Sequence, residues 1–467
     1  MVQALAEIAW KPRVAEGPEP LYQRLADSIQ QDIASGTLAS GSQLPTHREL
    51  ARSLGLGLGT VSKAYALAEQ RGLISGQVGR GSFVTAEEGE TAVEPGAGLL
   101  DLARNFPPPA IAERRMAQAL GQLRARADVA DAAAYTQVDG LKRTRVAAAQ
   151  WLRSRCGLQS AEADRLIQCN GGQHGLTIAL AAILKAGDTL LCDSATFFGV
   201  RMIAEYAGYR LHGVAMDGEG MTPEALEATA RASGARAVYL TPTLQNPTAR
   251  TLSAARRRAL AQVAERAGLT IVEDDVYRPF APAGEDLPTF ADLLPERTFH
   301  VTSLSKSICP GLRLGFIMPP DHARAATLRV AQAFGWSPSA LGGLIFAQWA
   351  EDGSADAILQ ETLAEVQARA ALALEILGPA AERPSFPASL HLWLPLPLLD
   401  AERAAGRAMR AGVEVTPIEA ALVSEDATPG IRLCLGGIRR RSDLAHALKV
   451  VRDSLSDEAA GRSVAYI

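Results

Sequence analysis

The sequence predicts an α/β protein in which a small helical unit precedes a larger unit built on a mainly parallel sheet. Helical periodicity runs through residues 21–70, and an acidic stretch with Gly and Pro, AEEGETAVEPGAG, follows at 86–98. Beyond this stretch, apolar runs typical of strands alternate with Ala-rich helical patterns. We therefore expect an N-terminal tail (1–17), a first domain (18–85), a flexible linker (86–98) and a second domain (99–467).

Composition limits the classes of function. The 467 residues are 48% hydrophobic and can bury a large core, and the formal net charge of −4 argues against a basic coat over the whole chain. Any nucleic-acid binding must therefore be local. The five cysteines lack CxxC spacing, which predicts reduced thiols and no metal site. We find no signal peptide and no apolar stretch that could span a bilayer, so we expect a cytoplasmic protein.

The first domain is expected to begin with a helix that stops at Ser35-Gly36. The apolar residues of this helix recur every fourth position, at Leu21, Leu25, Ile29 and Ile33. A second helix is expected after Thr46, because Glu49 stands three residues later and the pair can form a capping box. Gly55 breaks this second helix.

A third helix is predicted from about Thr60 to near Gly72. Its inward-facing residues would be Val61, Ala64, Tyr65 and Ala68. The runs 73–74 and 82–84 then indicate two short strands, joined by the Gly-rich turn GQVGRG. Three helices followed by a hairpin form the plan of a winged helix-turn-helix, whose last helix enters the major groove of DNA.

Over its whole length, this segment resembles the DNA-binding domain of the GntR family. The resemblance implies that Arg48 faces phosphate and base, that Thr60, Ser62 and Lys63 lie on the recognition helix, and that Gly79 and Arg80 form the tip of the wing. The segment has a modest excess of basic residues, which suits a dimer that binds two half-sites.

One departure from the GntR pattern concerns the turn into the recognition helix. Relatives often carry Thr and Arg there, whereas this chain has Gly57-Leu58-Gly59. The change removes side chains that would read bases, so the operator cannot be inferred by analogy. A winged helix can also serve as a protein-interaction module, and this alternative stays open.

In the second domain, five apolar runs predict strands, with Ala-rich helices between several of them. These runs are 189–192, 237–241, 269–272, 298–301 and 315–318. Strands that alternate with helices favour a mainly parallel sheet covered on both faces. In such sheets ligands bind at the carboxyl ends of the strands, so the candidate chemistry is sought there.

The strongest of these candidates is the stretch HVTSLSKSICPGLRLGF, at 300–316. Lys306 stands in a turn after an apolar strand, with Ser303 and Ser305 beside it and Arg313 seven residues later. A lysine amine forms Schiff bases with carbonyls, and hydroxyl groups with a guanidinium bind a phosphate dianion. This set describes a pocket for pyridoxal 5'-phosphate (PLP). A surface lysine in a loop is the competing interpretation of SLSK alone.

Other candidate groups lie at further strand ends and turns. Gly172 and Gln173, in NGGQ, precede a helix and could hold phosphate. Phe197 could stack on a flat ring, and Asn246 could donate to a phenolate oxygen. Asp274 could keep a pyridine nitrogen protonated, and Tyr277 could bond the same ring oxygen as Asn246. Taken singly, each of these residues could equally be structural.

As a set, NGGQ, Phe197, QNPT, EDDVY and SLSKSICPGLRLGF resemble the fold-type I, class I aminotransferases, from about Leu99 to the last helix. The resemblance implies that Lys306 forms the internal aldimine with PLP. It assigns the phosphate to the Gly172-Gln173 turn and Arg313, the ring face to Phe197, the ring nitrogen to Asp274, and the 3-oxygen to Asn246 and Tyr277. Phe in place of the more common Tyr at 197, and NPTA in place of NPTG, are departures that remove no reactive group.

Two further residues follow from the same resemblance. Tyr135, in AAYTQVDGL, matches a tyrosine that reaches the cofactor phosphate of the neighbouring subunit, which implies a homodimer. Arg432, in GIRLCLGG, matches an arginine that clamps the α-carboxylate of an amino acid through a two-pronged pair.

A GntR-like domain followed by an aminotransferase-like domain resembles the MocR subfamily of bacterial transcriptional regulators. The resemblance implies a PLP-dependent regulator in which an amino acid or amine effector displaces Lys306 and alters binding to operator DNA. Two alternatives remain. The chain could be a working aminotransferase with an accessory DNA-binding domain, or a regulator whose large domain no longer binds PLP.

Overall fold

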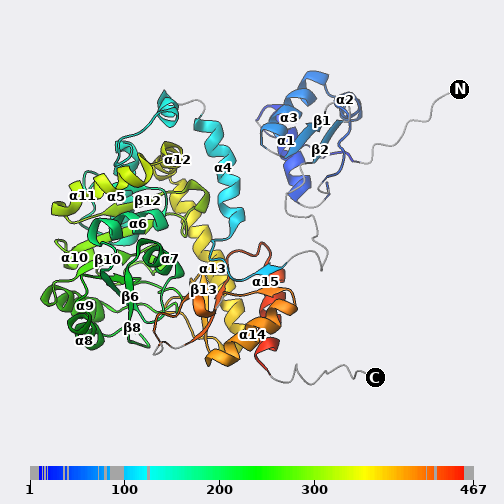
Figure 1. The fold of residues 1–467 in the computed structure, drawn as a ribbon. Coiled ribbons are helices and arrows are strands. Elements are labelled where there is room, and N and C mark those ends of the chain that lie inside the picture. Colours follow the sequence, from blue (N-terminus) through cyan, green and yellow to red (C-terminus); the bar gives the residue numbers. More distant parts are fainter. Residues whose placement is uncertain are drawn as a thin grey trace, which may run out of the picture. The chain divides into compact units, whose positions relative to one another are not determined.

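The computed structural model divides into two compact units, Met1–Gly98 and Leu99–Ile467. It describes residues 10–12, 14, 17, 19–34, 37–38, 41–71, 73–77, 81–84, 99–123, 127–416, 418–424, 427 and 429–456. The expected linker at 86–98, the helix stop at Ser35-Gly36, and the wing residues Gly79 and Arg80 lie outside the described residues. Figure 1 shows the fold of each unit.

The first unit has the predicted three helices and hairpin. The helices are α1 (Leu21–Ala34), α2 (His47–Leu54) and α3 (Leu58–Gln70), and the strands are β1 (Ile74–Gln77) and β2 (Gly81–Val84). The strands pair antiparallel, with Ile74 opposite Val84. Apolar faces of all three helices and both strands meet in one core, which includes the fully buried Leu25, Ile29, Leu50 and Val61.

Local capping sets the boundaries of α2 and α3. The Glu49 amide donates to Thr46 Oγ1 over 3.3 Å, and the Thr46 amide donates to Glu49 Oε2 over 2.8 Å, which confirms the capping box. Gly55 ends α2 with a φ of 66°, a conformation that favours glycine. The third helix begins at Leu58, two residues before the predicted start, because Gly57 acts as its N-cap without a side-chain hydrogen bond.

The second unit is built on a seven-stranded sheet in the order β4-β12-β11-β10-β9-β5-β6. Strands β5, β6, β9, β10 and β11 pair in parallel, and β12 runs antiparallel to both of its neighbours. The five predicted strands are present, whereas β4 and β6 were not predicted. The bounds are β4 (Ile167–Cys169), β5 (Thr189–Asp193), β6 (Arg210–Val214), β9 (Ala237–Leu240), β10 (Thr270–Asp274), β11 (Thr298–Ser303) and β12 (Gly315–Met318).

Helices cover both faces of this sheet (Figure 1). One face packs against α6 (Gly172–Ile183), α7 (Phe198–Ala207) and α11 (Arg324–Gly335). The other packs against α5 (Lys142–Cys156), α8 (Pro223–Ser233), α9 (Ala254–Arg266), α10 (Phe290–Leu293) and α12 (Ala340–Glu351). The central strands are buried on both faces, which is why they read as continuous apolar runs.

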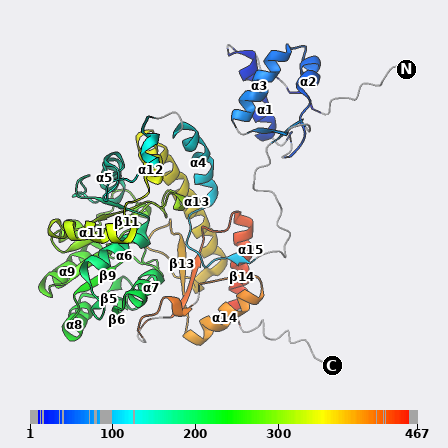
Figure 2. The same ribbon diagram turned by 45° about the horizontal axis from the view of Figure 1, so that its top comes forward.

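A smaller layer follows the long helix α13 (Ser354–Leu377) and has its own core (Figure 2). It contains the antiparallel pair β13 (His391–Pro395) and β15 (Gly430–Cys434), and the helices α14 (Leu398–Arg410) and α15 (Arg441–Leu455). The first strand of the unit, β3 (Leu100–Asp101), pairs here with β14 (Val413–Glu414). The pairing of β3 with β14 thereby attaches the start of the second unit to this layer.

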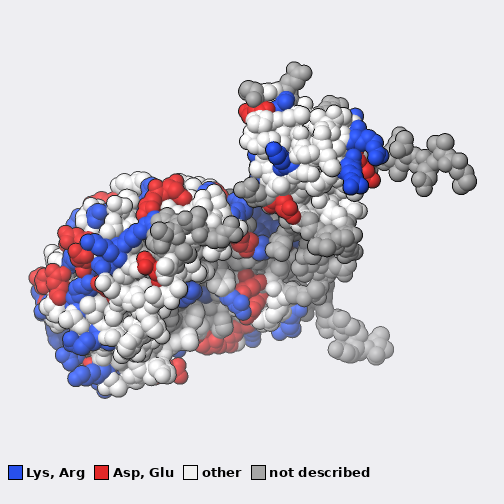
Figure 3. Space-filling view, turned by 90° about the horizontal axis from the view of Figure 1, so that it is seen from above, with Lys and Arg blue, Asp and Glu red and all other residues white. Residues whose placement is uncertain are grey.

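The remaining elements are short or lie at the edges of the unit. Helix α4 (Pro109–Leu123) packs against α12 and α13, and β7 (Met216–Asp217) pairs with β8 (Gly220–Met221). The 3₁₀ helices are Ala127–Ala133, Arg278–Phe280, Pro310–Leu312, Asp321–Ala323, Gly378–Ala380 and Ile418–Ala420. None of the helices that the structure describes is both long and apolar enough to cross a membrane. Positive and negative side chains are mixed over the face drawn in Figure 3.

Candidate functional site

Ten of the predicted cofactor residues line one cavity of about 150 Å³ in the second unit. The cavity lies at the carboxyl ends of β9, β10 and β11 and at the start of α6, as the sequence predicts for a parallel sheet. Leu176, Thr241 and Val276 complete its walls. The predicted residues that line it are Gly172, Gln173, Phe197, Asn246, Asp274, Tyr277, Ser303, Ser305, Lys306 and Arg313.

The amine of Lys306 is poised for nucleophilic chemistry. Its Nζ donates a hydrogen bond to the main-chain oxygen of Asn105, over 2.6 Å. Burial lowers the pKa of Lys306 to about 8; the positive charge of Arg432 acts in the same direction, and the negative charge of Asp274 opposes it. A substantial fraction of the amine is therefore neutral near physiological pH, which is the form that attacks a carbonyl.

Asp274 presents a carboxylate oxygen to the cavity. Its Oδ2 accepts a hydrogen bond of 2.7 Å from the phenol of Tyr239, and its Oδ1 is buried without a partner. Burial raises the pKa of Asp274 to about 6, against the hydrogen bond from Tyr239. A protonated pyridine nitrogen would give Oδ1 the donor that it lacks and would stabilise the carboxylate. This unpaired atom fits the ring of PLP.

The other end of the cavity suits an anion. Helix α6 begins at Gly172, and a Cβ atom on Gly172 would lie 3.4 Å from Cβ of Ser303, so the N-terminus of the helix lies beside the Ser303–Ser305 turn. The Ser305 amide donates to Ser303 Oγ over 3.0 Å, and Ser305 Oγ is buried without a partner. A Cβ atom on Gly171 would lie 2.8 Å from Nη2 of Arg313, so glycine is required for the guanidinium to lie here. These groups can hold a phosphate.

Between these two ends lie the groups expected at the ring. Phe197 is half-buried at the start of α7, and its ring meets Phe198 edge-on at a centroid distance of 4.9 Å. Burial raises the pKa of Tyr277, so its phenol stays protonated and can act as a hydrogen-bond donor. The side chains of Tyr277 and Asn246 come from different loops and meet at the same wall of the cavity.

Arg432 lies on β15, buried behind this wall. Its Nη1 donates to Asn246 Oδ1 over 2.8 Å, and its Nη2 donates to the carbonyl oxygen of Ala103 over 2.7 Å. Thr416 Oγ1 accepts from the same guanidinium over 3.0 Å. All three oxygen partners of the two Nη atoms are neutral, and the carboxylate of a ligand would bind these donors more strongly.

Several residues at the site were missed by the sequence analysis. Asn105 Nδ2 donates to the phenol of Tyr277 over 2.9 Å and lies 3.2 Å from His391 Nδ1. Burial lowers the pKa of His391 to about 3, so this ring stays neutral. Tyr239, in AVYLT, carried a usable signal, because a polar group inside an apolar strand that ends at the site is unusual. Asn105 and His391 had no such signal in the sequence, because only folding brings these two residues together.

Tyr135 is not part of this cavity. Its side chain is 84% exposed on the single chain, and it does not line the site. The chain on its own therefore does not bring Tyr135 to the cofactor residues, and its expected role in a neighbouring subunit stays a prediction.

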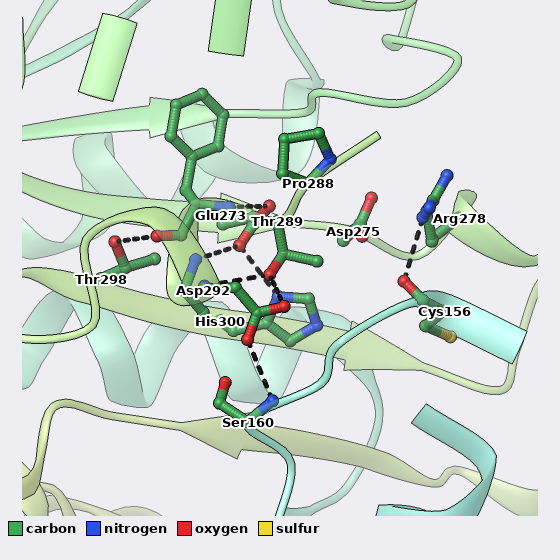
Figure 4. A network of polar contacts seen from close by, with 12 residues as sticks. Cys156, Ser160, Glu273, Asp275, Arg278, Pro288, Thr289, Asp292, Thr298 and His300 are labelled. Atoms are coloured by element: carbon green, nitrogen blue, oxygen red, sulfur yellow. Dashed lines mark hydrogen bonds and ion pairs between the residues drawn. The ribbon is translucent and has the colours of Figure 1, made fainter. Parts of the chain in front are cut away.

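A second polar network contains Glu273, Asp275 and His300 (Figure 4). Glu273 and Asp275 flank Asp274, and His300 Nδ1 lies 3.0 Å from Glu273 Oε2. These three buried residues are close enough to hold a metal ion. However, Glu273 already accepts hydrogen bonds from two main-chain amides at the start of α10.

The charge of this network is also balanced within the protein. Burial raises the pKa of Asp275, as does the carboxylate of Glu273. The positive charges of His300, Arg257 and Arg278 act in the opposite direction. Asp275 Oδ2 and His300 Nε2 are buried without a hydrogen-bond partner. Because charges of both signs offset one another here, we interpret the network as structural, next to the strand end that carries Asp274.

In the first unit, the described candidates for DNA contact lie on α2 and α3. Arg48 and Lys63 are exposed, and Thr60 is half-buried. The hydroxyl of Ser62 lies 3.1 Å from Nδ1 of His47, whose ring packs edge-on against Tyr65. Ser62 therefore has a partner inside the protein, which the sequence did not indicate.

Comparison with known families agrees with both units. Residues 21–84 match the sequence model of the bacterial regulatory proteins of the gntR family, and residues 96–451 match that of aminotransferase class I and II. The chain resembles a solved kynurenine aminotransferase of Pyrococcus horikoshii with a TM-score of 0.70 and 20% identity, over 78% of this chain and 92% of that one. At that identity the likeness concerns the fold.

Curated relatives are named as transcriptional regulators or repressors. An uncharacterized HTH-type transcriptional regulator of Bacillus subtilis, YdeF, is 31% identical over 67% of this chain and 68% of its own length. The vitamin B6 salvage pathway transcriptional repressor PtsJ of Salmonella typhimurium is 30% identical over 79% of this chain and 84% of its own. The chain therefore belongs to the MocR subfamily of HTH-type transcriptional regulators, in which a GntR-type DNA-binding domain is joined to a domain of the class I and II aminotransferase family.

Proposed function

We propose that this chain is a PLP-dependent DNA-binding regulator, in which an amino acid or amine effector displaces Lys306 from the cofactor and alters operator binding. The observation that carries the proposal is the single cavity in which Lys306, an unpaired oxygen of Asp274 and the phosphate-binding turns converge. When bound, PLP supplies an aldehyde that reacts with amines and a ring that withdraws electrons.

Each residue has a role toward the cofactor. Lys306 would hold the aldehyde carbon, and Asp274 would hold a proton on the ring nitrogen. The N-terminus of α6, with Ser303, Ser305 and Arg313, would hold the phosphate. Tyr277 and Asn246 would bond the ring oxygen, as the family resemblance implies.

Arg432 would connect effector binding to the start of the unit. An effector carboxylate would compete with the Ala103 carbonyl for Nη2 of Arg432. Ala103 and Asn105 lie a few residues after the expected linker. Their segment is attached to β14, because the amide of Leu102 donates to the carbonyl oxygen of Glu414. Displacing Ala103 would change the position of this segment, and the effector would act only as far as it favours the displaced state.

The experiment that tests the proposal is an absorbance spectrum of the purified protein in the near ultraviolet and visible range, repeated on Lys306→Ala. We expect a band of bound PLP that the variant lacks, with basal DNA affinity largely unchanged in the variant. Titration of amino acids and amines against that band then identifies the effector. No band after addition of PLP would contradict the proposal, and so would loss of all DNA binding in the variant.

A second function is favoured by the retention of every expected catalytic group in the cavity. The chain could carry out transamination, with regulation of DNA binding as an additional role. A steady-state assay with common amino donors and keto acids separates the two. Repeated turnover at rates typical of enzymes would favour the catalyst, and a single conversion without turnover would favour the sensor.

PLP itself is a further candidate for the signal, because the relative PtsJ is named as a repressor of vitamin B6 salvage. DNA affinity measured with the PLP-free and the PLP-loaded protein, both without amino acid, tests this directly. A change on PLP loading alone would assign the signal to the cofactor.

A further inference from the structure

The first turn of α3 carries an exposed leucine between two glycines. Leu58 is 47% exposed, and no other large hydrophobic residue that the structure describes in the first unit is exposed to a comparable degree. Val61 of the same helix and Leu50 of α2 are fully buried, and Leu54 and Leu67 are partly buried. Because the last helix of a winged helix-turn-helix enters the major groove, the exposed side chain of Leu58 at its start is placed where it can contact base edges.

The space on either side of Leu58 is open. A Cβ atom on Gly59 would have no neighbour within 4 Å, and one on Gly57 would meet only Oγ1 of Thr60, at 3.9 Å. Gly57, the N-cap, makes no side-chain hydrogen bond. Because no side chain projects from either flank, the edge of a base pair can come close to the helix start, and Leu58 is the side chain it would meet first.

The polar side chains near Leu58 differ in whether they are available to contact DNA. Arg48 and Lys63 are exposed and can attract phosphates, which favours DNA without reading its sequence. Ser62 is already bonded to His47. Thr60 is half-buried in the same turn, so the first turn offers the floor of a groove the aliphatic side chain of Leu58 beside one hydroxyl group.

We propose that Leu58 recognises the methyl group of a thymine in the major groove, so that each operator half-site contains a T·A pair fixed by this contact. The C5 methyl of thymine is the apolar group that base edges present in the major groove. The inference rests on the proposed DNA-binding function and adds a residue that sets its specificity. It also revises the expectation that Gly57-Leu58-Gly59 only removes base recognition: the glycines remove side chains, and the leucine supplies a different kind of contact.

The test uses full-length protein and DNA that differs by a single methyl group. Bound duplexes are first selected from a random-sequence pool to define the half-site. Each thymine is then replaced by deoxyuridine, which lacks only the C5 methyl. We expect one position per half-site where the replacement weakens binding roughly three- to fivefold, the effect of removing about one buried carbon. Leu58→Ala should weaken binding to thymine DNA by at least a similar factor and no longer distinguish the two bases.

Two matched variants make the result specific. Leu58→Met keeps an apolar side chain and should retain the preference for thymine over uracil. Lys63→Ala should weaken binding to both duplexes equally and reduce its salt dependence, with the ratio unchanged. Far-ultraviolet circular dichroism checks that all three variants are folded.

Two outcomes would overturn the inference, and they are distinguishable. If a half-site is enriched but no thymine shows a methyl effect that depends on Leu58, this inference fails and the DNA-binding function stands. If the full-length protein enriches no sequence at all, the DNA-binding function fails and the inference with it.

Discussion

Nζ of Lys306 donates a hydrogen bond to the carbonyl oxygen of Asn105, over a distance of 2.6 Å. Two residues earlier, the carbonyl oxygen of Ala103 accepts from Arg432 over 2.7 Å. The amine that would hold PLP and the guanidinium that would hold an effector carboxylate are thus both bonded to one short segment, which follows the expected linker directly. A ligand that competes for either group must change the contacts of this segment.

Asn105 should matter for cofactor binding although it carries no cofactor chemistry. Asn105→Ala would leave the phenol of Tyr277 and Nδ1 of His391 buried without this partner, at a cost of about 1–3 kcal/mol. We expect a Kd for PLP raised by roughly tenfold or more, measured by titration of the absorbance band. Arg104→Ala, at a side chain that is 71% exposed, is the matched control and should bind PLP normally. Equal affinities in the two variants would contradict the role of Asn105.

The pKa of Lys306 predicts how the PLP-free protein reacts with its cofactor. Because burial lowers this pKa to about 8, the neutral amine should be half-populated near pH 8 rather than above pH 10. The rate of band formation after addition of PLP should therefore rise up to about pH 8 and level off above it. Stopped-flow absorbance from pH 6 to pH 10 measures this, with Lys306→Ala as the background. A rate that keeps rising to pH 10 would show that the amine is not buried as described.

The sequence predicted the fold where the signal is local. Some signals can be recognised within a few residues: the capping box of Thr46 and Glu49, the strand at 315–318, the strand end that carries Asp274 and the turn that carries Lys306. The edge strand β6 escaped prediction because its exposed and buried residues alternate, RLHGV, and form no apolar run. Strand β4, at the opposite edge, is only three residues long.

Contacts over long sequence distances account for what was missed at the site. Asn105 reaches His391 across 286 positions and Lys306 across 201. No motif or residue spacing in the sequence predicts either of these two contacts. The reactive groups themselves lie in sequence motifs, whereas the groups that position them come from distant parts of the sequence outside these motifs. For the same reason Ser62 looked available for DNA, and only the structure revealed its bond to His47.

Asp274 should make the PLP-free protein less stable as the pH rises. Burial raises its pKa from 3.8 to about 6, so the folded state holds a proton that the unfolded state loses between these values. Stability should therefore fall across pH 4–6, by about 3 kcal/mol at most, and then stay level. Asp274→Asn cannot ionise, so its melting temperature relative to the wild type should improve from pH 4 to pH 7. Parallel pH profiles of the two proteins would contradict the raised pKa.

Arg432 should discriminate between effectors with and without a carboxylate. Arg432→Ala removes the donors to Asn246 and Ala103, and a carboxylate bound there would lose a charge-assisted pair worth about 3–5 kcal/mol. We expect a response to amino acids weakened by at least a hundredfold in titrations of the PLP band. The response to the matching decarboxylated amines should change far less. A loss of equal size for both classes would mean that the variant damages the site in general.

Tyr135 provides a test of shared sites between two subunits. Its side chain is 84% exposed on one chain, so a role at the cofactor requires a second copy. If Tyr135 bonds the phosphate of the partner's cofactor, Tyr135→Phe should weaken PLP binding by about 1 kcal/mol or more, roughly fivefold or beyond. The decisive measurement combines this variant with Lys306→Ala in co-expressed, separately tagged heterodimers. In these, one site has its own Lys306 and the intact tyrosine of the other subunit, and the second site lacks both. We expect half of the sites to bind PLP with wild-type affinity, which neither homodimeric variant can do. If Tyr135 acted within its own chain, the heterodimer would contain no intact site, and its affinity would match that of the Tyr135→Phe protein.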